Sequence, residues 1–228
     1  MAGELQNVVD IVFCIDCTGS MGPTIDWVKK KVLDFPGELK EALGRKDVTL
    51  HGMRIRVVAF RDLRNDLDAM EASVFFQMEK LKEKENFEKC ITKLVPRGGG
   101  DEPESGLEAL AIACNSDWVQ TGDKHRHIIV MFTDASAHRL EDRVGSVPAR
   151  FSCLMPDSLD ELTDIWDGGQ AVMLKRPARR LIIFGPDAYP WNTIADAWGQ
   201  TVYLPSQAGK GLEDVEYSTI LETITNSW

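Results

Sequence analysis

The sequence predicts an α/β fold: a doubly wound, mostly parallel central sheet with one antiparallel edge strand and helices on both faces. Short apolar runs alternate along the chain with longer segments whose apolar residues recur at helical spacing, as in parallel strands joined by crossover helices. The two most apolar runs, residues 8–15 and 127–133, are hydrophobic at nearly every position. Such runs are typical of strands covered on both faces.

A single domain is predicted for residues 1–228. The chain has 228 residues, 43% of them hydrophobic, which is enough to bury a substantial core. No linker-like or low-complexity stretch divides it, and no internal repeat of solenoid length is visible.

The first half of the chain is predicted to alternate strand and helix. Residues 8–15 form a strand and residues 25–43 a helix, because apolar residues recur in the second segment at helical intervals. Residues 53–62 alternate apolar and basic side chains and then become apolar throughout, as in a strand that enters the core. Residues 74–76 would pair with it as an antiparallel edge hairpin, since the intervening loop is too short for a crossover helix.

The rest of the chain continues this alternation. Two helices are predicted at 86–94 and 103–114, the second with Pro103 in its first turn. The remaining predicted elements are, in order, strand 127–133, helix 159–166, strand 180–184, helix 190–198, strand 202–204 and helix 217–224.

The net charge of −10, from 36 acidic and 26 basic residues, argues against nucleic acid as the main partner. Affinity for nucleic acid depends largely on Lys and Arg neutralising phosphates. The loop GGGDEPES also lacks the spacing of a phosphate-binding or dinucleotide-binding loop. A protein partner or a cation fits this composition better.

The chain is expected to be cytoplasmic. No apolar run approaches the roughly 20 residues that span a bilayer, and Asp10 interrupts the one early apolar run, so neither a membrane span nor a secretory signal is predicted. Five scattered cysteines are typical of a reduced compartment. Cys14 and Cys17 form a Cys-x-x-Cys, for which a redox role is the alternative to a buried strand cysteine beside a loop cysteine.

Oxygen-bearing side chains follow the first strand at alternate positions: Asp16, Thr18 and Ser20. Gly19 and Gly22 permit a tight turn, so the three side chains are expected in a strand-to-helix loop. In open parallel sheets, ligands bind beyond the carboxyl ends of the strands.

Two further loops are expected at the same edge. Asp134 follows the strand 127–133, and the segment RGGGDEPES carries Asp101, Glu102 and Glu104 toward a helix. An aspartate or hydroxyl at a strand end is commonly a helix cap, so each signal alone is weak. Oxygen ligands from three loops at one edge together predict a metal site.

These motifs resemble the von Willebrand factor A domain. The first loop, Asp16-Cys17-Thr18-Gly19-Ser20, resembles the family's Asp-x-Ser-x-Ser metal-ion-dependent adhesion site, in the Thr-Gly-Ser-Met form of intracellular and bacterial members. The later TDASAH, residues 133–138, resembles the TDAxxH of A domains found with atypical kinases. The resemblance covers essentially the whole chain and implies a Rossmann-like fold.

The resemblance implies roles for the site residues. Thr18 and Ser20 would bind the metal through their hydroxyls, and Asp16 and Asp134 through water. The family's second loop supplies a threonine, where this chain offers Gly100 or Asp101. Asp101 as a ligand would place an anion where the family has a neutral group and would weaken capture of an acidic partner; as an alternative, Asp101 caps the following helix.

The implied cofactor is Mg²⁺ or Mn²⁺, because Mg²⁺ prefers octahedral oxygen coordination that short hydroxyls can enter. The family's open position takes an Asp or Glu from a partner protein. The expected function is therefore a metal-dependent protein-interaction module without catalytic activity, acting as a subunit or adaptor in a larger intracellular assembly, such as one with an ATPase or a kinase and phosphatase pair.

A magnesium-dependent phosphatase or phosphotransferase of haloacid-dehalogenase-like type is the alternative. Those enzymes also keep a nucleophilic aspartate at the end of the first strand, where Asp16 lies. However, Thr18 stands where they have a second, acid-base aspartate, and no matching lysine motif follows.

Three remaining features are expected to be structural or peripheral. His138 is interpreted as a surface residue or as a neighbour of the site rather than a ligand. The long segment 139–156 either packs down through Phe151, Leu154 and Met155 or contacts an acidic partner. In the second case, the contacts would come from Arg139, Arg143 and Arg150. The tryptophans are expected in the core or at its rim.

Overall fold

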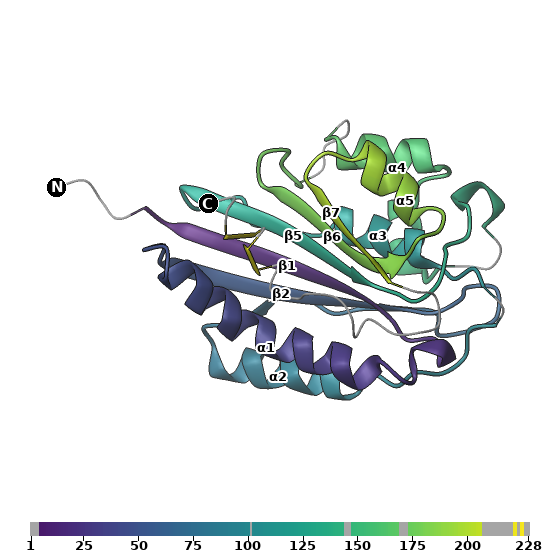
Figure 1. Ribbon diagram of the computed structural model, residues 1–228, viewed down its shortest axis with the longest axis horizontal. Coiled ribbons are helices and arrows are strands. Elements are labelled where there is room, and N and C mark those ends of the chain that lie inside the picture. The colour runs from purple at the N-terminus through teal and green to yellow at the C-terminus, as the bar shows by residue number, and fades with distance from the viewer. Residues whose placement is uncertain are drawn as a thin grey trace.

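The computed structural model describes residues 5–100, 102–143, 147–168, 173–206, 221–222 and 224–225. At its centre lies a seven-stranded sheet in the order β3-β2-β1-β5-β6-β7, with β4 also paired to β2 (Figure 1). The strands are β1 (Asn7–Asp16), β2 (Leu50–Phe60), β3 (Met70–Ala72), β4 (Phe76–Gln77), β5 (Lys124–Phe132), β6 (Arg179–Pro186) and β7 (Thr201–Ser206).

The pairing of the strands confirms the predicted fold class. β1 pairs in parallel with β2 and β5, and the parallel order continues through β6 to β7. The antiparallel edge consists of β3 and β4, both paired to β2. The sequence placed this edge at 74–76, but Val74 lies between the two short strands with its side chain 75% exposed. The ladder is interrupted there because the Val57 N–H bonds Ser73 Oγ at 3.0 Å, while the backbone oxygen of Ser73 accepts from Arg56 Nε at 2.9 Å.

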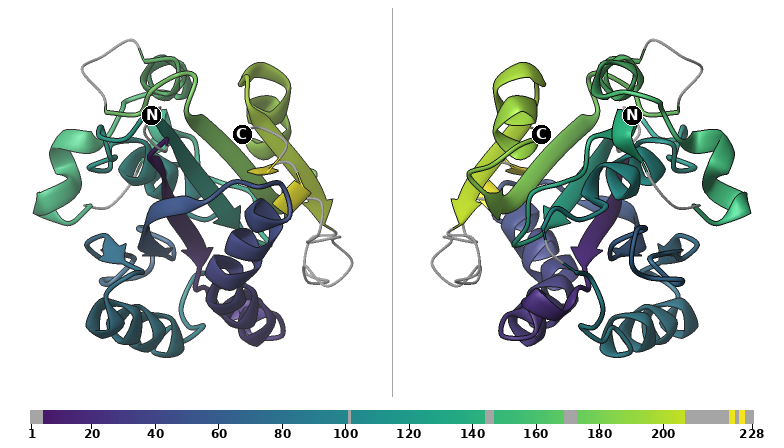
Figure 2. Two further views of the ribbon diagram at one scale, coloured as in Figure 1. Left: turned by 90° about the vertical axis from the view of Figure 1, so that its left-hand side faces the viewer. Right: turned by 90° about the vertical axis from the view of Figure 1, so that its right-hand side faces the viewer.

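Helices cover both faces of the sheet. Figure 1 shows α1 and α2 on one face and α3, α4 and α5 on the other, and the two end views of Figure 2 show the sheet between these layers. The helices are α1 (Ile25–Gly44), α2 (Leu81–Thr92), α3 (Gly106–Cys114), α4 (Leu159–Trp166) and α5 (Trp191–Ala197).

The central strand β1 contributes to both halves of the core. Ile11 and Phe13 pack with residues of α1 and α2, while Val12 and Cys14 pack with residues of α3, α4 and α5. Successive side chains of a strand point to opposite faces, so a strand with apolar residues at every position suits a sheet covered on both sides. The physical basis of the sequence prediction is therefore confirmed.

Two helix starts differ from the prediction. α2 begins at Leu81 rather than at 86, because the first turns carry mostly charged, exposed residues that the apolar pattern does not reveal. α3 begins at Gly106 rather than at Pro103. Glu104 instead forms a parallel bridge with Ala137, so the chain is still extended after Pro103. Most of the predicted helix 217–224 lies outside the described residues.

The segment 139–156 packs against the fold in part. It contains the 3₁₀ turns η2 (Leu140–Asp142) and η3 (Ala149–Leu154). Phe151 is buried, and Arg143 donates to the carbonyl oxygen of Pro156 at 3.0 Å. The four tryptophans of the described segments that the sequence placed in the core or at its rim are all buried there: Trp118, Trp166, Trp191 and Trp198. None of the described helices is long and apolar enough to cross a membrane.

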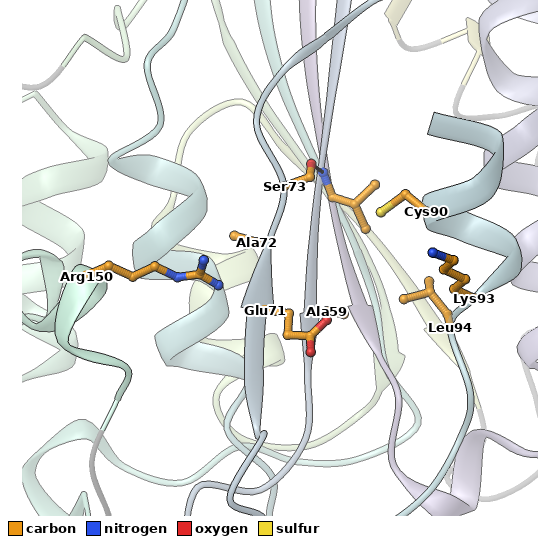
Figure 3. A pocket seen from close by; sticks show the side chains of 9 residues that line it. Ala59, Glu71, Ala72, Ser73, Cys90, Lys93, Leu94 and Arg150 are labelled. Atoms are coloured by element: carbon orange, nitrogen blue, oxygen red, sulfur yellow. Dashed lines mark hydrogen bonds between the residues drawn. The ribbon is translucent and has the colours of Figure 1, made fainter. Parts of the chain in front are cut away.

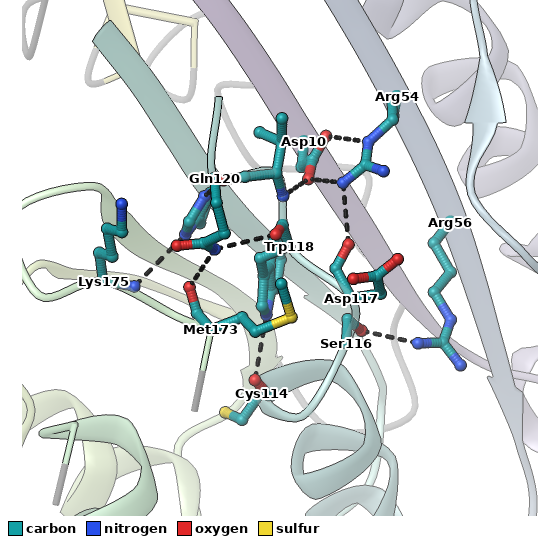
Figure 4. Close-up of polar contacts among 12 residues, drawn as sticks. Asp10, Arg54, Arg56, Cys114, Ser116, Asp117, Trp118, Gln120, Met173 and Lys175 are labelled. Atoms are coloured by element: carbon teal, nitrogen blue, oxygen red, sulfur yellow. Dashed lines mark hydrogen bonds and ion pairs between the residues drawn. The ribbon is translucent and has the colours of Figure 1, made fainter. Parts of the chain in front are cut away.

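A buried ion pair lies near the start of β1 (Figure 4). The Asp10 carboxylate, 1% exposed, accepts two hydrogen bonds from Arg54 of β2, at 2.8 and 2.5 Å, and one from the Val119 N–H at 2.6 Å. Burial raises the pKa of Asp10, and Arg54 and the Val119 N–H oppose that shift. This pair joins β1, β2 and the loop before β5 at the edge opposite the Asp16 end of β1.

The open edge of the sheet borders a cavity of about 440 Å³. Figure 3 shows Cys90 of α2 and Lys93, which follows that helix, on one side of the edge strands and Arg150 of η3 on the other, with Glu71 of β3 between them. None of its lining residues belongs to the loops that carry Asp16 and Asp134. The cavity is therefore separate from the predicted site.

A buried histidine in β5 should make stability depend on pH. The His127 side chain is fully buried, its Nε2 bonds Val119 O at 2.9 Å, and its Nδ1 accepts from the Lys175 N–H at 3.4 Å. Burial, together with the nearby charges of His125, Lys175 and Arg54, lowers the pKa of His127 to about 4, against the hydrogen bond to Val119 O, which raises it. The fold therefore holds the neutral ring.

We expect wild-type protein to lose stability through His127 as the pH falls from about 6.5, the unfolded pKa, to about 4. Within that window the unfolded state binds more protons, so the unfolding free energy falls by up to about 1.4 kcal/mol per pH unit. Urea titrations between pH 4.5 and 7.5 should show this slope reduced in His127→Gln. His51→Gln, at the start of β2, should retain it; equal slopes in wild type and His127→Gln would contradict the assignment.

Candidate functional site

The loops that follow β1, β2 and β5 meet the glycine-rich loop before α3 at the carboxyl edge of the sheet, which the right-hand view of Figure 2 faces. Backbone hydrogen bonds join the first loop to the glycine loop: Gly19 N to Gly98 O at 3.1 Å and Arg97 N to Cys17 O at 2.9 Å. The glycines permit this approach. A Cβ at Gly99, where φ is +80°, would lie 2.8 Å from Glu104 Oε1 and 3.0 Å from Thr18 Cβ.

Four of the five predicted ligands form one hydrogen-bonded chain. Asp16 Oδ1 accepts from the backbone N–H of Thr18 at 2.9 Å and from its Oγ1 at 2.7 Å. Thr18 Oγ1 lies 3.0 Å from Ser20 Oγ, which donates to Asp134 Oδ1 at 2.9 Å. On the other side, Thr133 Oγ1 donates to Asp16 Oδ2 at 2.7 Å. The fifth, Asp101, lies outside the described residues.

The two central hydroxyls have no proton left for each other. A hydroxyl carries one donor and two acceptor lone pairs. Thr18 directs its proton to Asp16, and Ser20 directs its proton to Asp134. The contact of 3.0 Å between the two hydroxyl oxygens therefore has no hydrogen to share when both carboxylates are charged. The free lone pairs of both oxygens remain available for a cation.

The hydroxyls do not serve as helix caps. Thr18 is the N-cap residue of the 3₁₀ turn η1 (Gly19–Met21), but its side chain makes no capping hydrogen bond. α1 begins later, after Thr24, whose side chain also makes no capping hydrogen bond. The capping alternative for Thr18 and Ser20 is therefore wrong, and the two side chains bond the carboxylates instead.

Burial affects both aspartates of this chain. Asp16 is fully buried, and burial raises its pKa to about 6 although the hydrogen bonds from Thr18 and Thr133 lower it. Burial likewise raises the pKa of Asp134, against the hydrogen bond from Ser20. Within the described segments, no ion pair involves either aspartate. A cation is the group that would favour both charged forms.

Glu104 is a site residue that the sequence analysis did not assign to the metal. Its side chain is 3% exposed, and its Oε2 has no hydrogen-bond partner. Burial, together with the charges of Asp16, Asp62, Asp66 and Asp134, raises its pKa to about 9. Its position beside Thr18 depends on the bridge to Ala137, with Glu104 N donating to Ser136 O at 2.9 Å. The one signal in the sequence was an acidic residue within the glycine-rich loop.

The loop after β2 supplies further unpredicted residues. Asp62 accepts from the Arg64 N–H at 2.9 Å, from the Asn65 side chain, and from His138 Nε2 at 3.2 Å. His138 is buried, so the predicted surface position is wrong; its backbone N–H bonds Glu104 O at 2.9 Å. Burial lowers its pKa, and the positive charge of Arg64 lowers it further. His138 thus acts as a neutral hydrogen-bond partner of Asp62.

The described residues contain no group of three or more His, Cys, Asp and Glu side chains placed to hold a metal ion. A cation site at this edge would therefore need ligands besides these four side-chain types. Cys14 and Cys17 are both buried, and burial raises the pKa of both thiols, that of Cys17 to about 12. Because the thiolate is the reactive form, this agrees with the structural interpretation of the pair.

A profile of the von Willebrand factor type A domain matches residues 11–137, more than half of the chain and all of the loops described above. The chain belongs to the von Willebrand factor A domain family. The resemblance noted in the sequence is thereby confirmed.

Individual relatives are more distant. The chain is 25% identical over 136 residues to the alpha-protein kinase vwkA of Dictyostelium discoideum, a match that spans 60% of this chain and 20% of that protein. The pilus adhesin SpaC of Lactobacillus rhamnosus GG matches 98% of this chain in two crystal structures, one in an open conformation, at 13% identity. The TM-scores are 0.57 and 0.55, and 31% and 30% of those chains are covered. The likeness to SpaC shows the fold alone.

We expect Gly99→Ala to destabilise the protein by about 1 kcal/mol or more, because the new side chain would meet Glu104 and Thr18 and would have to adopt a left-handed backbone conformation. Gly37→Ala is the matched control. Gly37 lies within α1 with open space around it, so alanine there should stabilise by roughly 0.5–1 kcal/mol. Chemical unfolding of both variants measures the difference. Equal effects would show that the glycine loop does not need its close approach.

Proposed function

We propose that the protein is a metal-dependent protein-interaction module whose cation site lies at the carboxyl edge of the sheet. The observation that carries this proposal is the pair of hydroxyl oxygens of Thr18 and Ser20, 3.0 Å apart, each donating its only proton to a carboxylate. Two lone-pair-bearing oxygens in a cluster with two carboxylates suit a hard divalent cation. The family membership supports an interaction role.

The residues present suit Mg²⁺ or Mn²⁺. Thr18 and Ser20 would bind the cation directly, and Asp16 and Asp134 would hold the two hydroxyls and act on the cation through water. When bound, the cation supplies a positive, coordinatively open centre that accepts an oxygen ligand. The partner would provide this ligand from an Asp or Glu side chain.

Glu104 is the additional ligand that we assign to the second loop, in place of the family's threonine. Its Oε2 is buried and lacks a donor. Its Oε1 and the Thr18 side chain both border Gly99. An anionic ligand here lowers the net positive charge of the site and so weakens capture of an acidic partner relative to members with threonine. Asp101 remains a predicted ligand; the helix-cap alternative is wrong, because α3 begins at Gly106 with Ser105 as its N-cap residue.

The cellular setting of the module also belongs to this proposal. We place it in the cytoplasm as a subunit or adaptor of a larger assembly, with an ATPase or a kinase system as one class of associate. A kinase is among the proteins with a matching segment, which supports this class. The comparisons give no support to the haloacid-dehalogenase-like alternative, and Thr18 occupies the position where such an enzyme needs its second aspartate.

We expect chelator-treated protein to bind Mg²⁺ and Mn²⁺ saturably in titration calorimetry and Ser20→Ala to lose about tenfold or more in affinity. Ser20 is exposed, so its loss should leave the fold intact. Ser152→Ala removes one equally exposed hydroxyl, bonded to Ala149 O in η3, and should bind as wild type does. Saturable binding with no difference between the two variants would show that the hydroxyl pair is not the site.

A second titration tests whether Mg²⁺ binding depends on Glu104 in particular or on any buried carboxyl group. Glu104→Gln should weaken Mg²⁺ binding by about tenfold or more, because an anionic oxygen ligand is lost. Glu108→Gln is the matched control, since Glu108 in α3 is also buried with an orphan Oε2. Its affinity should stay within twofold of wild type. If Glu104→Gln binds as tightly as Glu108→Gln does, Glu104 is not a ligand.

A further inference from the structure

A polar groove containing two arginines lies beside the proposed cation site. Arg64, from the loop after β2, and Arg139, from the loop after β5, line one cavity of about 330 Å³ together with Tyr189. Arg64 also lines an adjoining cavity of about 450 Å³ that reaches Asn65 and Gly100. Both volumes lie within the range of roughly 300–1,000 Å³ typical of small ligand sites.

The two guanidinium groups are positioned without being neutralised. Arg64 donates to the backbone oxygen of Asp142 at 3.1 Å, which holds η2 against the loop after β2. The Arg139 guanidinium lies over the ring of Tyr189, 5.4 Å from its centre. Among the described residues, neither arginine has a carboxylate within ion-pair distance. Both side chains are exposed, so an incoming anion can reach them.

Hydrogen bonds within the chain hold two of the acidic side chains that line these cavities, those of Asp62 and Glu102. Asp62 is bonded by His138, Asn65 and the Arg64 N–H, and Glu102 accepts from Ser136 Oγ at 3.3 Å. Asp142 contacts Arg64 through its backbone oxygen. The cavity that both arginines line has one acidic residue in its lining, Asp142, so its two guanidinium groups outnumber its carboxylates in a chain with a net charge of −10. Such a site favours an anion despite the overall charge.

The groove and the proposed cation site are formed by the same loops. Ser136 and Ala137, which line the groove, follow Asp134 in the same loop. Pro103 lines both cavities and directly precedes Glu104, which bridges to Ala137. A partner segment that reaches the cation therefore passes directly beside the groove.

We propose that the Arg64–Arg139 groove binds a second carboxylate of the acidic partner segment whose first carboxylate completes the cation site. Guanidinium groups bind carboxylates through two parallel N–H···O bonds. The contact of the Arg139 guanidinium with the Tyr189 ring leaves less side-chain freedom to lose on binding. The proposal rests on the proposed function for the position of the first carboxylate. It defines the partner as a segment with at least two acidic residues.

Fluorescence anisotropy with a labelled hexaglutamate peptide tests the groove, with Mg²⁺ present and again in chelator. Arg64→Gln/Arg139→Gln should bind at least about tenfold more weakly than wild type, the loss expected for one charge-assisted hydrogen-bonded contact. The control Arg45→Gln/Arg176→Gln removes two exposed arginines elsewhere and should stay within twofold of wild type. A peptide with one Glu among five Gln should show little difference among the three proteins. Thermal melts confirm that all variants fold.

The outcomes separate the two proposals. Weaker binding in the groove variant but not in the control supports the groove, and equal binding in both, or no saturable binding by wild type, overturns it. Loss of Mg²⁺ dependence in Ser20→Ala supports the cation site. Binding that chelator and Ser20→Ala leave unchanged counts against the proposed function even if the arginines matter. Tighter binding by about tenfold of a hexapeptide with one phosphoserine would assign the groove to phosphate and overturn the carboxylate assignment.

Discussion

The buried carboxylate of Asp16 is the feature on which the arrangement of the site depends. It ends the central strand β1, which runs in parallel between β2 and β5, and it is fully buried. Thr18 bonds one of its oxygens and Thr133 the other, at 2.7 Å each. Because a buried carboxylate without donors is strongly unfavourable, these bonds fix the first loop and the loop after β5 to one point at the edge of the sheet.

The rest of the edge is built around this anchor. The glycine loop approaches the first loop backbone to backbone, and Glu104 is drawn in by its bridge to the Asp134 loop. The result is a cluster of buried carboxylates without a basic partner among the described residues. The charged form of Asp16 is disfavoured by burial and by the charge of Asp134, and that of Glu104 by burial and by the charges of Asp16 and other nearby aspartates. A divalent cation would reverse that balance, which is the physical reason for reading the cluster as a metal site rather than as a structural network.

Two positively charged side chains, those of Arg64 and Arg139, lie on loops at the same edge of the sheet as the carboxylates. At the other end of β1, Asp10 and Arg54 neutralise each other in an ion pair. Among the described residues, Arg64 and Arg139 have no such carboxylate partner, although they lie on loops at the edge that carries the carboxylates. A surface that presents a proposed cation on one side and arginines on the other suits one extended acidic segment rather than a single isolated carboxylate.

The sequence determined the fold class and most of the site through local patterns. The apolar runs at 8–15 and 127–133 required a sheet covered on both faces, and the placement of Asp16, Thr18, Ser20 and Asp134 followed from the rule that strand ends in a parallel sheet share an edge. These features depend on neighbours in sequence, so a single chain reveals them. The helix 159–166 was located without error for the same reason.

Only the tertiary structure decided which loop residues meet. Pro103 looked like a helix start, but its loop is extended by a bridge to Ala137, and that bridge brings Glu104 beside Thr18. Arg64 and Arg139 are far apart in the chain and carry no shared pattern; the order β2-β1-β5-β6 brings their loops and Tyr189 to one groove. Local spacing in the sequence shows which polar side chains each loop carries. Contacts between loops depend on strand order and backbone path, which no local pattern encodes.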